Sequence, residues 1–299
     1  MMGAIIGDIV GSRFEWHNYR HKDFTLFHPK CRPTDDSIMT LAVAKAILMA
    51  RPGYENLAEQ AVAAMQELGR KYPKAGYGRG FRTWLQSEHP APYNSFGNGS
   101  AMRVSPAGFA ARTEDEAKAL SFAVTAVTHN HPEGIKGAEV VAVLIYHARQ
   151  GMAMKELHEL AQDRYYPLDF TLDEIRPTYE FSSSCQGSVP QALVAFFSST
   201  DFEDAIRNAI SIGGDSDTIA AIAGSLAEAH YGIPKDLREA AMQRLDAPLQ
   251  DIVTACQLPA TEVASLRESF DTSICLDRPG LLHSQSCEVQ QRSGNYQSH

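Results

Sequence analysis

The amino-acid sequence predicts an all-α fold. Apolar residues recur at helical spacing through most of the 299-residue chain, which is typical of helices that bury one face. No segment shows the apolar–polar alternation of a convincing strand, and we find no fixed-period repeat. Glycine and proline gather between the periodic segments, where they end helices and form loops.

The first two predicted helices lie in the N-terminal quarter of the chain. Residues 35–50, DDSIMTLAVAKAILMA, have apolar side chains at helical spacing and few residues that favour strands. Residues 55–72 form a clearly amphipathic pattern that ends before Pro73, and proline does not continue a helix. We therefore predict two helices ahead of this proline.

Seven more helices are predicted in the rest of the chain. Residues 114–129 follow Thr113, which suits an N-cap, and residues 133–151 end in Gly151, a residue type common at helix C-termini. The same periodicity predicts the other five: 155–165, 189–199, 202–211, 217–232 and 235–245. Alanine and glycine are plentiful inside these helices, which permits close helix crossings.

Three glycine- and proline-rich segments between the helices are predicted to be loops: 73–80, 90–108 and 182–190. Long loops on a rigid helical body often carry function. From about Pro279 the chain is polar and aperiodic. We therefore expect a single domain over residues 1–278 and a flexible tail over residues 279–299.

The composition is that of an ordinary globular protein, with 44% hydrophobic residues and a net charge of −9. No run of lysine and arginine stands out, so nucleic acid is not an expected partner. The five cysteines lie far apart without CxxC spacing, which favours a reducing compartment. Neither a signal peptide nor a membrane-spanning run is found. We expect a cytoplasmic monomer that does not bind membranes.

Two clusters of acids and hydroxyls stand where loops turn into apolar helices. Each cluster alone is explained by helix capping, because acids and hydroxyls suit the N-terminal end of a helix. Two such helix starts facing each other would gather four carboxylates, which cannot all stay ionised without cations. Hard oxygen ligands favour two Mg²⁺ or Mn²⁺ ions. The clusters comprise Thr34, Asp35 and Asp36, and Asp215, Asp217 and Thr218.

A third stretch, NSFGNGSAMRVSP at residues 94–106, places Gly97 and Gly99 around Asn98. Small residues with free amides can form an anion-binding concavity for phosphates, and Phe96 could stack on a nucleobase. The alternative is a tight surface turn with Phe96 in the core. The pattern alone does not choose between them.

Several single residues leave two interpretations open. Gly213 and Gly214 allow a close approach to a ligand or simply a turn. His129 follows a predicted helix, where it either complements the helix dipole or binds in a pocket. Asp8 and Glu15 are notable in an otherwise apolar start, and Glu15 is either a solvated surface acid or a site carboxylate.

Five stretches in this order resemble the ADP-ribosylglycohydrolase family. They extend from Gly3 to Gly224 and read GAIIGDIVGSRFE, TDDSIMTLAVA, FGNGSAMRVSP, THNHPEGIKGAE and GGDSDTIAAIAG. The resemblance implies a compact orthogonal multi-helix bundle with a centre of two metal ions, Mg²⁺ or Mn²⁺.

The resemblance also implies roles for individual residues. The metal ligands it implies are Thr34, Asp35, Asp36, Asp215, Asp217 and Thr218. The general base would be one of Glu15, Asp35 and Asp36. The residues expected to line or bind the ADP-ribose are Ser95, Phe96, Gly97, Asn98, Gly99, His129, Gly213, Gly214 and Ser216.

The implied reaction is hydrolysis of the glycosidic bond at C1″ of the distal ribose, which releases ADP-ribose from a modified protein or small molecule. Such hydrolysis passes through an oxocarbenium-like transition state and needs an activated water. Arginine-linked ADP-ribose is the expected substrate, and serine-linked, poly- or O-acetyl-ADP-ribose are alternatives. Two other functions stay open: a metal-dependent hydrolase of another nucleotide-type substrate, and a non-catalytic binding or structural protein.

Overall fold

The prediction of an all-α fold is confirmed in a computed structural model of the chain, which describes residues 1–258 and 262. Over these residues the structure has fifteen α-helices and no strand, with one isolated antiparallel bridge between Gly97 and Ser184. Met1–Gln257 form one compact unit. The tail expected over residues 279–299 lies outside the described residues.

The helices follow one another through short connections, and one 3₁₀ turn, Pro52–Tyr54, lies among them. The α-helices are α1 (Met2–Gly11), α2 (Asp35–Met49), α3 (Leu57–Lys71), α4 (Arg79–Gln86), α5 (Gly99–Met102), α6 (Ser105–Ala110), α7 (Glu114–Thr125), α8 (Pro132–Arg149), α9 (Met154–Arg164), α10 (Leu172–Ile175), α11 (Cys185–Phe197), α12 (Phe202–Ile210), α13 (Ser216–Tyr231), α14 (Lys235–Met242) and α15 (Ala247–Ala255). No helix among the described residues is long and apolar enough to cross a membrane.

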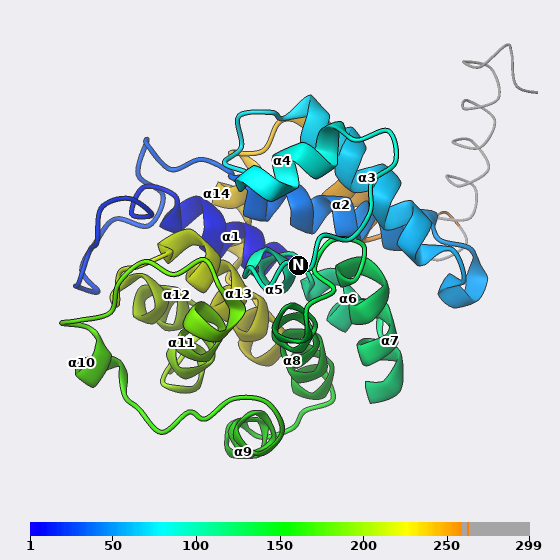
Figure 1. The fold of residues 1–299 in the computed structure, drawn as a ribbon. Coiled ribbons are helices and arrows are strands. Elements are labelled where there is room, and N and C mark those ends of the chain that lie inside the picture. Colours follow the sequence, from blue (N-terminus) through cyan, green and yellow to red (C-terminus); the bar gives the residue numbers. More distant parts are fainter. Residues whose placement is uncertain (259–261, 263–299) are drawn as a thin grey trace, which may run out of the picture. The chain divides into compact units, whose positions relative to one another are not determined.

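Helices α1 and α13 form the centre of the unit, with α2, α3 and α4 on one side and α8, α11 and α12 on the other (Figure 1). Gly3, Gly7 and Gly11 follow one another at four-residue spacing on the face of α1 that meets α13. A Cβ at Gly7 would overlap the carbonyl oxygen of Ala220. The missing side chains let the two backbones touch, so that the C-terminal end of α1 lies against Asp217 at the start of α13.

The predicted loops proved partly wrong. Helix α5 lies within residues 90–108, and α6 begins there and continues to Ala110. Helix α11 begins at Cys185, four residues earlier than predicted, with Pro190 inside it. Proline removes one backbone donor from a helix, and the buried apolar residues on both sides of Pro190 keep this helix packed. Helix α1 was not predicted at all, because three glycines in ten residues weaken the helical signal.

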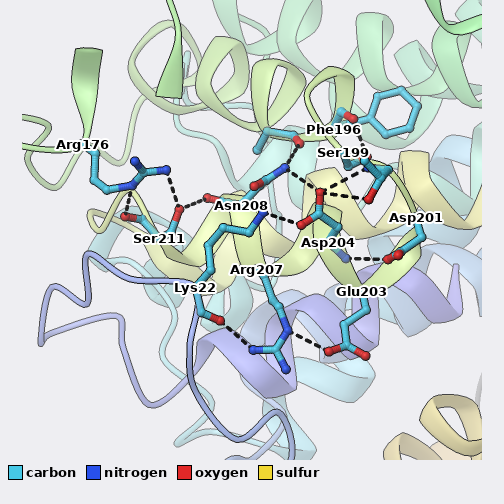
Figure 2. Close-up of polar contacts among 12 residues, drawn as sticks. Lys22, Arg176, Phe196, Ser199, Asp201, Glu203, Asp204, Arg207, Asn208 and Ser211 are labelled. Carbon is cyan, nitrogen blue, oxygen red and sulfur yellow. Dashed lines mark hydrogen bonds and ion pairs between the residues drawn. The ribbon is translucent and has the colours of Figure 1, made fainter. Parts of the chain in front are cut away.

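Helix α12 and the residue after it hold two loops, as the contacts of Lys22 and Arg176 show (Figure 2). Arg207 donates hydrogen bonds to the carbonyl oxygens of Lys22 at 2.7 Å and Phe24 at 2.9 Å. Beyond the end of the helix, the carbonyl oxygen of Ser211 accepts from Arg176 Nε at 3.1 Å. The loop after α1 and the loop before α11 are therefore both held to the same element.

Candidate metal centre and ligand cleft

Three helix ends bring a group of carboxylates together. Carboxylate oxygens of Asp8, Asp36 and Asp217 all lie within 4.8 Å of one another, and those of Glu15, Asp215 and Asp217 form a second such group. These acids come from α1, from the start of α2, from the start of α13 and from the loop after α1. The two clusters separated by about 180 residues in the sequence do converge, as predicted.

Asp8 holds the start of α2 in place. Its carboxylate accepts hydrogen bonds from Thr34 N at 2.9 Å, from Thr34 Oγ1 at 2.6 Å, from Ser37 N at 3.0 Å and from Ser37 Oγ. The Thr34 hydroxyl also caps α2 by accepting from Asp36 N at 3.4 Å. The Thr34 hydroxyl therefore donates its proton to Asp8. Thr34 is not among the residues that line the cleft beside these acids.

Asn98 braces the start of α13. Its Nδ2 donates to Asp215 Oδ2 at 2.7 Å, which joins the NSFGNG stretch to the acid cluster. Asp217 Oδ1 accepts from the backbone N of Thr218 at 3.0 Å, and carboxylate oxygens of Asp217 and Asp36 lie within 4.8 Å of each other. The first turns of α2 and α13 thus face each other across the site.

The acids of this cluster have raised pKa values. Burial, followed by repulsion from neighbouring carboxylates, raises the pKa of Asp35 and of Glu15 to about 7. The same two causes raise the pKa of Asp36 and of Asp217 well above the ordinary value. Asp36 Oδ1 is buried and has no hydrogen-bond partner among the described residues. A buried carboxylate oxygen without a donor fits a divalent cation bound by hard oxygens.

A cleft of about 420 Å³ opens beside these acids. Eleven of the sixteen predicted site residues line it. They are Glu15, Asp35, Asp36, Ser95, Gly97, Asn98, Gly99, His129, Asp215, Asp217 and Thr218. The other five, which do not belong to the cleft lining, are Thr34, Phe96, Gly213, Gly214 and Ser216.

The glycine pair before α13 forms a turn, with φ of +74° at both Gly213 and Gly214. A Cβ at Gly214 would collide with the ring of Tyr179, and Gly214 N donates to Asn18 Oδ1 at 2.8 Å. Ser216 Oγ donates to the carbonyl oxygen of Gly214 at 3.3 Å. These contacts within the protein shape the approach to Asp215 and Asp217, and the contact of these residues with a ligand stays a prediction.

Phe96 was predicted to stack on a nucleobase or to lie in the core. Its side chain is 47% exposed, and its ring meets the edge of His131 with the ring centres 5.3 Å apart. The core alternative is therefore wrong for this residue.

The structure adds cleft residues that the sequence analysis did not single out. Trp16 and Phe181 stack at 5.3 Å between ring centres, and both remain exposed at the cleft. At Gly76, with φ of +129°, a Cβ would lie 2.7 Å from Asp35 Oδ1. The stretch GYGRGF, from Gly76 on, was a usable signal, because glycines beside aromatic residues mark close backbone approach.

Comparisons with known proteins find similar proteins for most of the chain. The profile of the family "ADP-ribosylglycohydrolase" matches residues 1–265. The chain is 27% identical to human ADP-ribosylhydrolase ARH3, over 78% of this chain and 84% of that protein. It is 28% identical to the ADP-ribosyl-[dinitrogen reductase] glycohydrolase of Rhodospirillum rubrum, over 73% and 74% of the two chains.

Two further matches concern a shorter region of the chain and the fold. An ADP-ribosylarginine hydrolase, Tri1 of Pseudomonas putida, is 29% identical over 46% of this chain and 39% of that protein. A solved structure titled "ADP-ribosylglycohydrolase-related protein complex" superposes with a TM-score of 0.58 at 22% identity, over 89% of this chain and 97% of the other. The structural match supports the fold.

Proposed function

This chain belongs to the ADP-ribosylglycohydrolase family, whose enzymes hydrolyse glycosidic linkages of ADP-ribose, and we propose that it releases ADP-ribose from ADP-ribosylated arginine. The observation that carries the proposal is the convergence of buried carboxylates, with one oxygen of Asp36 left without a donor, on the wall of a cleft. A helical bundle that needed these acids only as caps would not gather them at one point, because their mutual repulsion is costly.

We propose that two Mg²⁺ or Mn²⁺ ions bind here. The residues suited to hold them are Glu15, Asp35, Asp36, Asp215, Asp217 and Thr218, all of which line the cleft. Thr34 instead supports the ligands indirectly, because it donates to Asp8 and caps the start of α2. When bound, such ions supply positive charge that acidifies water and polarises substrate oxygens.

The chain's own residues provide the remaining parts of the reaction. Water oxygen forms a bond to C1″, the glycosidic bond breaks, and the leaving side chain gains a proton. Asp35 and Glu15 are suited to accept the proton from water, because both carboxyl groups line the cleft beside the proposed ions. Asp36 is the third candidate base, more deeply buried at 3% exposure. Asn98 and the glycines beside it border the cleft where the ADP-ribose would lie.

The names of two relatives support arginine as the linked residue only in part. Tri1 is named for ADP-ribosylarginine, whereas the name of the Rhodospirillum rubrum relative specifies its protein target. Serine-linked, poly- and O-acetyl-ADP-ribose are the competing substrates.

The test is incubation of the protein with arginine- and serine-linked ADP-ribosylated proteins in Mg²⁺, Mn²⁺ or EDTA. We expect release of ADP-ribose from the arginine linkage that EDTA abolishes. Replacements Asp36→Asn and Asp217→Asn should each reduce this release by at least about 100-fold, whereas Asp251→Asn on the exposed face of α15 should not. Release of AMP would indicate phosphoester hydrolysis, and tight binding of ADP-ribose without release would indicate a non-catalytic protein.

A further inference from the structure

His129 stands in the cleft wall against a fully buried arginine. The Arg103 side chain is 1% exposed, and its Nη2 donates to Thr128 Oγ1 at 2.6 Å. The same Nη2 lies 3.4 Å from His129 Nδ1, and Thr128 Oγ1 lies 2.6 Å from that nitrogen. Two polar groups of fixed position therefore meet at one nitrogen of the imidazole ring.

The donor and acceptor roles at this nitrogen follow from the chemistry of the groups. A guanidinium only donates, so a proton on His129 Nδ1 would point toward the N–H of Arg103. The Thr128 hydroxyl accepts from Arg103. Its own proton has two acceptors in reach, His129 Nδ1 at 2.6 Å and the carbonyl oxygen of Thr125 at 3.4 Å, and the shorter contact is the stronger hydrogen bond. Nδ1 therefore accepts, and a neutral ring carries its proton on Nε2.

The surroundings of His129 favour the neutral form of its imidazole ring. Burial, followed by the positive charge of Arg103, lowers the pKa of His129 well below its ordinary value. The ring of Tyr93, 6.1 Å away between ring centres, is the other titratable group beside it. The imidazole thus presents an uncharged N–H.

The free N–H faces the ligand cleft. A Cβ placed on Gly97 would lie 3.5 Å from His129 Nε2, and one on Gly99 would lie 3.4 Å from it. Both glycines line the cleft. Among residues 1–258 and 262, Nε2 has no hydrogen-bond partner, and the ring makes its polar contacts with Arg103 and Thr128 through Nδ1.

We infer that Arg103 and Thr128 are positioning residues that fix His129 as the Nε2–H tautomer, so that the cleft offers a neutral donor to an oxygen acceptor of the ligand beside Gly97 and Gly99. With ADP-ribose as that ligand, the inference rests on the proposed function. The position of the proton on the His129 ring is a property of the protein alone and does not depend on the ligand.

The first experiment is ¹⁵N NMR of the histidine-labelled full chain at neutral pH, with the His129 signals assigned by loss in His129→Gln. We expect an unprotonated Nδ1 and a protonated Nε2 in the parent protein. Thr128→Val removes the hydroxyl at nearly constant volume. Because Arg103 still disfavours a proton on Nδ1, we expect the tautomer to be kept and the Nδ1 resonance to shift as its hydrogen bond from Thr128 is lost. Thr125→Val, one turn earlier on the same buried segment, should leave the parent spectrum unchanged.

The second experiment measures ADP-ribose binding by calorimetry. Thr128→Val should weaken binding about fivefold to tenfold, the worth of one hydrogen bond, with Thr125→Val close to the parent protein. A protonated Nδ1 in the parent protein, or identical spectra and affinities for the two valine variants, would overturn the inference. Because the NMR result does not depend on turnover, a protein that fails to release ADP-ribose refutes the proposed function without touching this assignment.

Discussion

At the scale of single residues, Asp8 has two roles: it supports the start of α2, and it belongs to the acid cluster. It is fully buried and takes four hydrogen bonds from Thr34 and Ser37, so it braces the start of α2. It is also one of three acids whose oxygens lie within 4.8 Å of one another. Its position thus couples the placement of Asp36 to the charge of the site.

Replacing Asp8 tests this coupling. Asp8→Asn can keep the three hydrogen bonds to Oδ2, and the Thr34 hydroxyl can turn to accept from the new amide. The charge is lost, and we expect the Mn²⁺ concentration for half-maximal activity to rise about 10- to 100-fold, as for other residues that support metal ligands. A metal titration of activity measures the effect, and an unchanged midpoint would show that Asp8 is structural only.

At the scale of elements, the contact between α1 and α13 sets the position of the acids. The glycine face of α1 allows backbone contact along the N-terminal half of α13. Asp8 and Asp217 lie on these same two helices. A displacement of either helix would therefore move one carboxylate against the others.

Gly7→Ala should show the strength of this constraint. The added Cβ would overlap the backbone at Ala220, and overpacking of this kind costs about 1–3 kcal/mol even after the gain in helix propensity. Gly69→Ala in α3 is the control, because its Cβ would meet only the flexible Leu85 side chain. Urea denaturation compares the two, and equal stabilities would contradict the packing argument.

Glu114, on α7, forms ion pairs with residues of α8 and α9 and makes a pH-dependent contribution to the stability of the fold. It pairs with Lys118 at 2.7 Å, His147 at 2.7 Å and Arg164 at 3.0 Å, on α7, α8 and α9. Hydrogen bonding by Lys118, the largest cause, and then by His147 lowers the Glu114 pKa to about 2. A lowered carboxyl pKa stabilises the fold above the unfolded value near 4.5, and this stabilisation is lost as pH falls toward 2.

We therefore expect Glu114→Gln to reduce the free energy of unfolding by about 1 kcal/mol at pH 7, a value typical of a partly exposed network. The difference between the two proteins should shrink steadily below pH 4.5. Thermal unfolding from pH 7 to pH 3 measures it. A difference that stays constant over this range would mean that the loss arises from packing rather than charge.

At the scale of the whole molecule, the site stores electrostatic repulsion that metal binding would relieve. The pKa of Asp35 and of Glu15 is raised by burial and neighbouring acids to about 7. A carboxyl with a raised pKa binds more protons in the folded than in the unfolded state, so stability falls as pH rises from about 4 to 7.

Metal-free protein should accordingly unfold at a lower temperature at pH 8 than at pH 5. Mg²⁺ or Mn²⁺ at 100 times its dissociation constant at pH 5 should add about 2.7 kcal/mol at that pH. The same ion concentration should raise Tm more at pH 8, where the carboxylates are ionised and bind the ion more tightly. Differential scanning calorimetry with EDTA and with each ion measures both effects. A Tm that does not respond to either ion would contradict the metal assignment.

Much of the molecule follows from local patterns in the sequence. The helical periodicity predicted α2, α3, α8 and α13 within a few residues of their ends, because amphipathic spacing and capping are local properties. The two acid clusters and the GNG stretch were recognisable for the same reason, since each is a short run of unusual composition. Their order along the chain identified the family.

Only the tertiary structure decided how those pieces work together. It made Gly213, Gly214 and Ser216 a turn packed on the protein's own side chains, and it placed Phe96 outside the cleft lining. It also showed α1 as a helix, because close packing on α13 outweighs the weak helix propensity of its glycines. The sequence alone determined which groups are available for chemistry. Their distances, burial and partners arise from contacts between segments far apart in the chain, and these contacts decide which groups face the ligand.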